Sequence, residues 1–208
     1  MIILIENQIL PPIAVYREFL KSEKVIIEKF DNYQKRTFRN RFMIMTSKGI
    51  QTVSIPLQKG KNSSLFTDVK IAYDMDWLRT LSATFRTNYG SAPFFEHYFD
   101  SLMDIFYSRF NFLYDLNIRL HDFINTAMEI DIKYEFSQFY KGKFDKGNDL
   151  RNKYLPYNFN EELFTKNLIM YNQVFIEKTG FVPNLSILDL LFNRGKYGQN
   201  ILLDQPSK

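Results

Sequence analysis

Short apolar runs separated by polar breaks organise the first third of the chain. Branched apolar residues fill residues 1–6 (MIILIE) and 24–30 (KVIIEKF), a composition typical of buried strands. Between them, residues 13–20 (IAVYREFL) follow a helical period behind Pro11 and Pro12. These three segments predict a β-α-β unit. Residues 41–47 and 50–57 then flank Lys48-Gly49, which predicts an antiparallel hairpin, and the alternation over 66–73 predicts one more strand.

The middle of the chain has helical periodicity. We expect a helix from residue 77 with Asp76 as its cap, a second over 93–107, and a third that is capped by Asn111 and extends to residue 128. A return strand over 132–136, a long loop over 141–162 and a closing helix over 185–193 follow. The pattern predicts an α/β fold, with a single mixed β-sheet made from the β-α-β unit and the hairpin, covered by packed helices in one domain over residues 1–208.

Composition excludes several chemistries. The 208 residues include no cysteine and two histidines, so disulfide frameworks, Cys/His zinc sites, iron–sulfur clusters and Cys–His nucleophiles are excluded. No dinucleotide-binding, Walker or nucleophile-elbow motif occurs. We therefore predict neither a metal nor a cofactor. No apolar run is long enough to span a membrane and the N-terminus lacks the basic region of a signal peptide, so we expect a cytoplasmic protein.

Positive charge is concentrated in one segment. The chain has a formal net charge of +4, yet residues 33–66 contain no Asp or Glu and seven Lys or Arg residues. Such a segment is a candidate surface for binding phosphate, nucleotide or another anion. The alternative is a basic hairpin that only faces solvent.

Within this segment, Gln34, Lys35, Arg39, Asn40 and Arg41 form the candidate binding motif. Guanidinium groups bind phosphate or carboxylate with two parallel hydrogen bonds and keep their charge at all physiological pH values. On an extended segment Arg39 and Arg41 would lie on one face and could converge on a single anion. The alternative is that these residues form structural salt bridges.

Two later segments carry the candidate catalytic residues. Gln173, in YNQVF, has an amide suited to orienting a hydroxyl or an attacking amine, and Tyr171 could stack on a ring. Both could instead belong to the core, with Gln173 bonded to the backbone. Asp189 lies on an apolar helix, where a carboxylate requires a partner. We expect Arg39 or Arg41 as that partner, with Asp189 acting as a structural clamp or as a general base.

Three strings carry a family resemblance: NYQKRTFRNR at 32–41, YNQVF at 171–175 and FVPNLSILDLLFNRG at 181–195. With LPP at 10–12, VSIPLQKG at 53–60, Trp77 and YGSAPFFEHY at 89–98, they resemble the WbqC-like family over most of the chain. The chain departs from longer members between residues 139 and 167, where those carry a Gly-rich, Tyr-containing turn.

This resemblance implies a role in surface-polysaccharide, O-antigen or lipopolysaccharide biosynthesis, with transfer of an amino acid such as glycine to a sugar. The leading hypothesis is a transferase that binds a small anionic or nucleotide-linked substrate at residues 34–41. We expect this motif, Gln173 and Asp189 to meet around one cleft. The alternative is a non-catalytic binding protein for an anionic partner or, less favoured, nucleic acid, with Tyr33, Phe42 or Phe66 as stacking surfaces.

Overall fold

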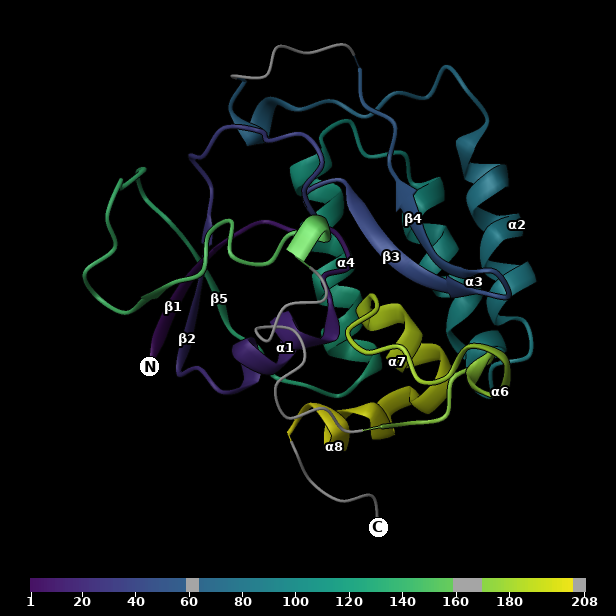
Figure 1. Ribbon diagram of the computed structural model, residues 1–208. Coiled ribbons are helices and arrows are strands. Elements are labelled where there is room, and N and C mark those ends of the chain that lie inside the picture. The colour runs from purple at the N-terminus through teal and green to yellow at the C-terminus, as the bar shows by residue number, and fades with distance from the viewer. Residues whose placement is uncertain (59–63, 159–169, 204–208) are drawn as a thin grey trace.

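A four-stranded parallel sheet forms one side of the protein in the computed structural model, which describes residues 1–58, 64–158 and 170–203 (Figure 1). Its strands run in the order β5-β2-β1-β6. They comprise β1 (Ile2–Glu6), β2 (Lys24–Glu28), β5 (Tyr134–Phe136) and β6 (Asn148–Asp149). The helix α1 (Ile13–Leu20) connects β1 to β2. The predicted β-α-β unit is confirmed, because local apolar periodicity and the two prolines already define each of its elements.

The hairpin forms a sheet of its own and does not extend the parallel sheet, a difference from the single sheet expected above. Its strands β3 (Arg41–Thr46) and β4 (Gly49–Ser54) pair with each other in antiparallel register. The other edge of β3 is already occupied. The backbone N–H of Ser186 donates to the Met43 carbonyl at 2.8 Å, and the Met45 N–H donates to the Tyr89 hydroxyl at 3.2 Å. These bonds use the groups that another strand would need.

The helices α2 (Trp77–Tyr89), α3 (Phe95–Tyr107) and α4 (Leu113–Ala127) form the middle of the chain. Asp76 caps α2, since its side chain accepts a hydrogen bond from the Arg79 N–H. The third helix begins later than expected, with Phe112 at the cap position in place of Asn111. The strand expected over 66–73 is also wrong. This segment holds a short 3-10 helix, η1 (Phe66–Asp68), followed by isolated bridges from Lys70 to Phe112 and from Ile71 to Leu57.

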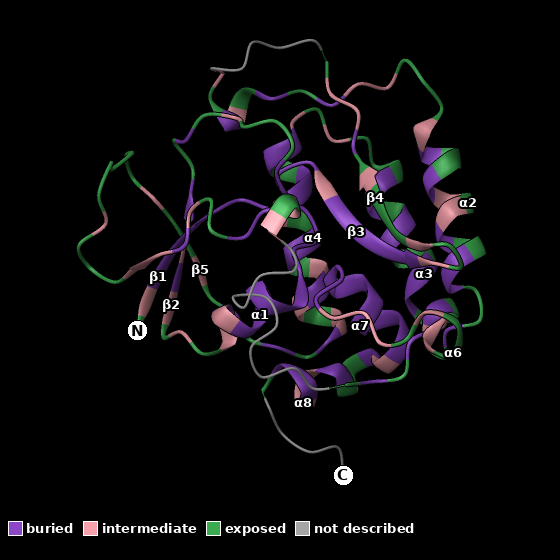
Figure 2. Cartoon of the chain, viewed as in Figure 1, coloured by how far each residue is buried: buried purple, intermediate pink, exposed green. Residues whose placement is uncertain are grey.

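The helix α7 (Ile187–Arg194) is almost entirely buried (Figure 2). It contacts α1, α3, α4 and β3, and every residue from Ile187 to Asn193 is buried. Ser186 caps its first turn by accepting the Leu188 N–H at 3.3 Å. Gly195 ends it at φ +56°, where an added Cβ would lie 2.6 Å from the ring of Phe94. The closing helix predicted over 185–193 is confirmed, with its ends shifted by one or two residues.

The C-terminal part contains the short helices α6 (Ile176–Thr179) and α8 (Gly198–Leu202) and the 3-10 turns η2 (Pro156–Asn158) and η3 (Gly195–Tyr197). Within the loop expected over 141–162, residues 148–149 form β6, and residues 159–162 lie outside the described part. The residue before β6 must be a glycine, Gly147, because a Cβ there would lie 2.1 Å from the Ile2 carbonyl oxygen. Of the 139–167 segment that departs from longer family members, residues 159–167 likewise lie outside the described part. In the described ranges, no helix is long and apolar enough to cross a membrane.

Candidate functional site

A basic pocket of about 490 Å³ lies where the segment before β3 meets the segment around η1. We call it the basic pocket. Four cations and one carboxylate contribute to its wall, so the pocket is strongly positive. It is lined by Tyr33, Lys35, Arg36, Asn40, Arg41, Leu57, Gln58, Ser64, Asp68, Val69 and Lys70.

Hydrogen bonds fix the polar side chains of this pocket. The Tyr33 hydroxyl donates to Asn40 Oδ1 at 3.0 Å, and Asn40 Nδ2 donates to the Ile55 carbonyl at 3.0 Å. The Tyr33 ring stacks on Phe66 with 6.3 Å between centroids. The Nε of Arg41 is buried and has no hydrogen-bond partner among the described residues. A pre-ordered tyrosine beside a guanidinium that lacks a full set of partners is suited to a phosphate-bearing ligand.

Arg39 does not share this pocket. Its side chain is 0% exposed and forms an ion pair with Asp31. Its Nη1 also donates to Asn152 Oδ1 at 3.2 Å, and weakly to Thr37 Oγ1 at 3.4 Å. The convergence of Arg39 and Arg41 on one anion is therefore wrong. Residues 35–40 form turns and bends, so the alternation of an extended strand does not apply before Arg41.

Asp189 is held by neutral donors and not by the expected arginine. The carboxylate is 0% exposed and accepts hydrogen bonds from Tyr171 at 2.7 Å, Tyr89 at 2.9 Å and Gln173 at 3.0 Å. Burial raises the pKa of Asp189, and the three donors partly oppose this rise. The clamp that we expected on the basic motif instead joins α7 to α2 and to the segment 171–173.

Gln173 also fixes the chain around it. Its Nε2 donates to the Val182 carbonyl at 2.8 Å, and its Oε1 accepts the Val182 N–H at 2.9 Å. Burial raises the pKa of the Tyr171 phenol well above its ordinary value, and the Asp189 carboxylate adds to this. These contacts match the core alternative given for Tyr171 and Gln173. We call Tyr89, Tyr171, Gln173 and Asp189 the Asp189 cluster.

The expected single cleft is not formed by these segments. Lys35, Asn40 and Arg41 line the basic pocket, whereas no residue of the Asp189 cluster is among its described lining residues. The cluster touches β3 at Met45, four residues from Arg41, which is about 13 Å along a strand. Gln34 lines a different pocket, together with Asp31 and Asn32.

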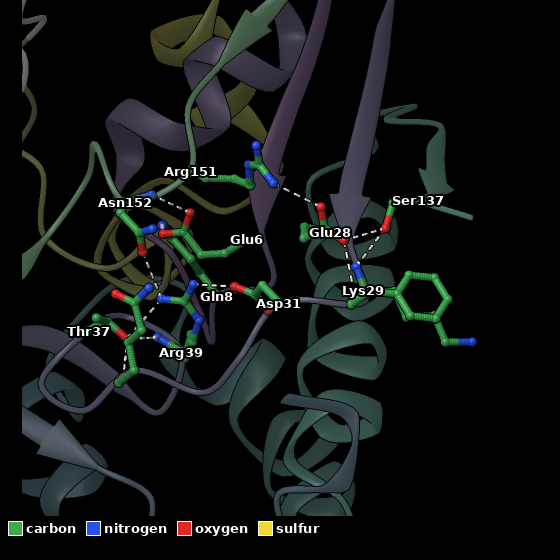
Figure 3. A network of polar contacts seen from close by, with 12 residues as sticks. Glu6, Gln8, Glu28, Lys29, Asp31, Thr37, Arg39, Ser137, Arg151 and Asn152 are labelled. Atoms are coloured by element: carbon green, nitrogen blue, oxygen red, sulfur yellow. Dashed lines mark hydrogen bonds and ion pairs between the residues drawn. The ribbon is translucent and has the colours of Figure 1, made fainter. Parts of the chain in front are cut away.

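Sequence reasoning missed a buried polar network at the carboxyl end of the parallel sheet (Figure 3). Glu6 and Glu28, the last residues of β1 and β2, are each 1% exposed and lie opposite each other in the register. The Arg151 guanidinium contacts Glu28 at 3.2 Å and Asp149 at 2.7 Å. Burial raises the pKa of Asp31, although the adjacent Arg39 lowers it, and the carboxylates of Glu6 and Glu28 add to the rise.

A signal for this network was present in the sequence. Both MIILIE and KVIIEKF carry a glutamate directly after a buried apolar run, and in parallel sheets such ends meet at one edge. The arginine that serves them comes from residue 151, inside the segment expected to be a loop, and no local pattern connects it to residue 28.

The model of the WbqC-like protein family matches residues 7–155, well over half of the chain. The chain belongs to the WbqC-like family. The family match includes every residue that lines the basic pocket, and also Gln34, Asp31, Arg39 and Arg151. The Asp189 cluster, apart from Tyr89, lies outside the matched range. No curated protein and no solved structure matches the chain.

Proposed function

We propose that this WbqC-like protein is a transferase of surface-polysaccharide (O-antigen) assembly that binds an anionic, phosphate-bearing activated donor in the basic pocket. The observation that carries the proposal is the grouping of Lys35, Arg36, Arg41 and Lys70 around one pocket of about 490 Å³. Four cations against one carboxylate would attract a diphosphate, because charge-assisted bonds to phosphate are the strongest available to these side chains. The polysaccharide context of the proposal is what the resemblance to the WbqC-like family implies.

The volume of the basic pocket, about 490 Å³, suits a small donor. Tyr33 and Arg41 both line it, so the Tyr33 ring offers a surface for a base or sugar and Arg41 a partner for phosphate. The amino acid or glycosyl group would be carried on the phosphate. Gln173 and Asp189 have no catalytic role in this proposal, because both are buried in the Asp189 cluster.

Thermal unfolding in the presence of nucleotides, sugar nucleotides and aminoacyl donors tests the proposal. A ligand at 100 times its dissociation constant should stabilise the fold by about 2.7 kcal/mol, which for a chain of this size raises Tm by about 5–10 °C. The variant Arg41→Ala should lose this response and stay folded. The matched control is Lys48→Ala, because Lys48 is exposed in the hairpin turn and lies outside the pocket.

Two results would contradict the proposal. Equal loss of response in Lys48→Ala and Arg41→Ala would mean that overall charge, and not the pocket, attracts the ligand. Salt-sensitive binding of any oligonucleotide, with no response to the small phosphates, would favour the non-catalytic binding protein.

A further inference from the structure

A second pocket, of about 540 Å³, lies at the carboxyl edge of the parallel sheet. We call it the sheet-edge pocket. It is lined by Phe30, Asp31, Asn32, Gln34, Leu65, Tyr140, Gly142, Asp149, Arg151 and Asn152. From β1 the chain adds β2 and β5 on one side of the sheet and then β6 on the opposite side of β1. The direction of strand addition therefore reverses between β1 and β6. In open α/β sheets this reversal point is where ligands bind.

Carboxylates outnumber guanidiniums at this edge of the sheet. Asp31 and Asp149 line the pocket, and Glu6 and Glu28 end the two adjacent strands. Within the described residues, the ion pairs of these four carboxylates involve two guanidiniums, Arg39 and Arg151. Glu6 accepts only neutral donors there, from Gln8 at 2.7 Å and from the Asn152 N–H at 2.8 Å. A buried carboxylate without an ion pair, such as Glu6 at 1% exposure, is costly, and a cation bound nearby would reduce that cost.

Hydrogen-bond acceptors are also in excess. Asp31 is 6% exposed and lines the pocket, yet its Oδ1 has no donor among the described residues. The amide oxygens Asn7 Oδ1 and Gln8 Oε1, in the segment directly after β1, are buried without a donor among the described residues as well, although they do not line the pocket. Their orientation is set by the other atom of each amide, which donates to the Tyr114 carbonyl and to Glu6 respectively. Three buried acceptors in this region, one of them on a residue that lines the pocket, therefore have no donor among the described residues.

We propose that the sheet-edge pocket binds the ammonium group of a primary amine. An ammonium carries one positive charge and three donors and has no acceptor, so it supplies both of the missing quantities. An anion does not suit the site, because Arg151 already directs its Nε and Nη2 at Asp149 and its Nη1 at Glu28. A metal ion lacks a site, since the described residues contain no group of three or more His, Cys, Asp or Glu arranged to hold one.

The wall of the pocket restricts the rest of the ligand. The Arg151 guanidinium lies 5.1 Å from the centre of the Tyr140 ring and holds this ring beside the carboxylates. The ring therefore offers an aromatic surface in the pocket. A compact carbon skeleton carrying the amine would rest on this ring. The inference concerns a second ligand and does not rest on the proposed anionic donor.

Amide chemical shifts measured by NMR during titration provide the test, with glucosamine and glucose as matched probes that differ in one amine. Glucosamine should bind at least about tenfold more tightly than glucose, because a charge-assisted bond replaces a neutral one. The shifts should map to residues 31–34 and 149–152. Ethanolamine against ethylene glycol repeats the comparison without the ring.

Asp149→Asn should weaken glucosamine binding by about tenfold. Asp145→Asn removes the same charge from an exposed position that does not line the pocket, so its binding should equal that of the natural protein. Asp31→Asn should abolish glucosamine binding if this variant folds. If it does not fold, the comparison of Asp149→Asn with Asp145→Asn tests the inference. Equal affinity for the amine and the hydroxyl probe, shifts that map elsewhere, or equal effects of Asp145→Asn and Asp149→Asn would each overturn the inference.

Discussion

Replacing Arg39 by alanine should destabilise the protein far more than replacing Arg41, although the two residues are separated by one position. The Arg39 side chain is 0% exposed and forms an ion pair with Asp31, which is 6% exposed. Arg41 is only partly buried and lines the basic pocket. The same substitution therefore removes a buried charge partner in one case and a ligand-facing group in the other.

The magnitude follows from what Arg39→Ala leaves behind. Removing one partner of a buried ion pair costs about 3–5 kcal/mol, because the remaining carboxylate is buried without compensation. Each kcal/mol lowers Tm by about 2–4 °C in a chain of roughly 200 residues, so we expect a fall of about 6–20 °C. Arg41→Ala should cost less than about 1 kcal/mol, as partly exposed arginines do.

Urea unfolding followed by circular dichroism measures both variants, with the slope m checked for constancy. The double variant Arg39→Met/Asp31→Leu provides the control, since replacing both charges by apolar groups should recover part of the loss. An Arg39→Ala variant within 1 kcal/mol of the natural protein would refute the reasoning. So would an Arg41→Ala variant that loses as much stability as Arg39→Ala.

Three further predictions concern the scaffold. Burial lowers the pKa of His121 from 6.5 to about 4. The stability from the neutral imidazole is therefore fully present above pH 6.5 and should fall by about 3 kcal/mol as the pH drops to 4. The variant His121→Gln should remove this pH dependence, which urea titrations at several pH values measure. Tyr171→Phe should lower the free energy of unfolding by about 1.5–3 kcal/mol in the same assay, because it removes a donor to a buried carboxylate. It should leave the ligand-induced rise in Tm unchanged. A lost ligand response without lost stability would mean that Tyr171 belongs to the ligand site. Gly195→Ala should lower stability by about 1–3 kcal/mol, since φ is +56° and the Cβ would clash with a phenylalanine ring, whereas Gly142→Ala, with open space around it, should be nearly silent in thermal unfolding.

Local physics was enough to predict most elements from the sequence. The β-α-β unit, the hairpin, the cap at Asp76 and the helix from Ser186 to Gly195 depend on residues close to one another in the chain. Apolar periodicity, caps and glycine stops act within a few positions, so a single sequence displays them. The prediction for residues 66–73 was wrong because this segment forms isolated bridges to Leu57 and Phe112 and no continuous strand.

The roles of the charged residues depend on the tertiary structure. The sequence alone shows that residues 33–66 carry an excess of positive charge. Whether an arginine faces a pocket or a buried carboxylate depends on partners far along the chain, as Arg151 with Glu28 and Asp189 with Tyr89 demonstrate. Burial and pairing set the energy of a charge, and both come from contacts between distant segments. For this reason Arg39 forms a structural ion pair, whereas Arg41, two positions later, lines a pocket.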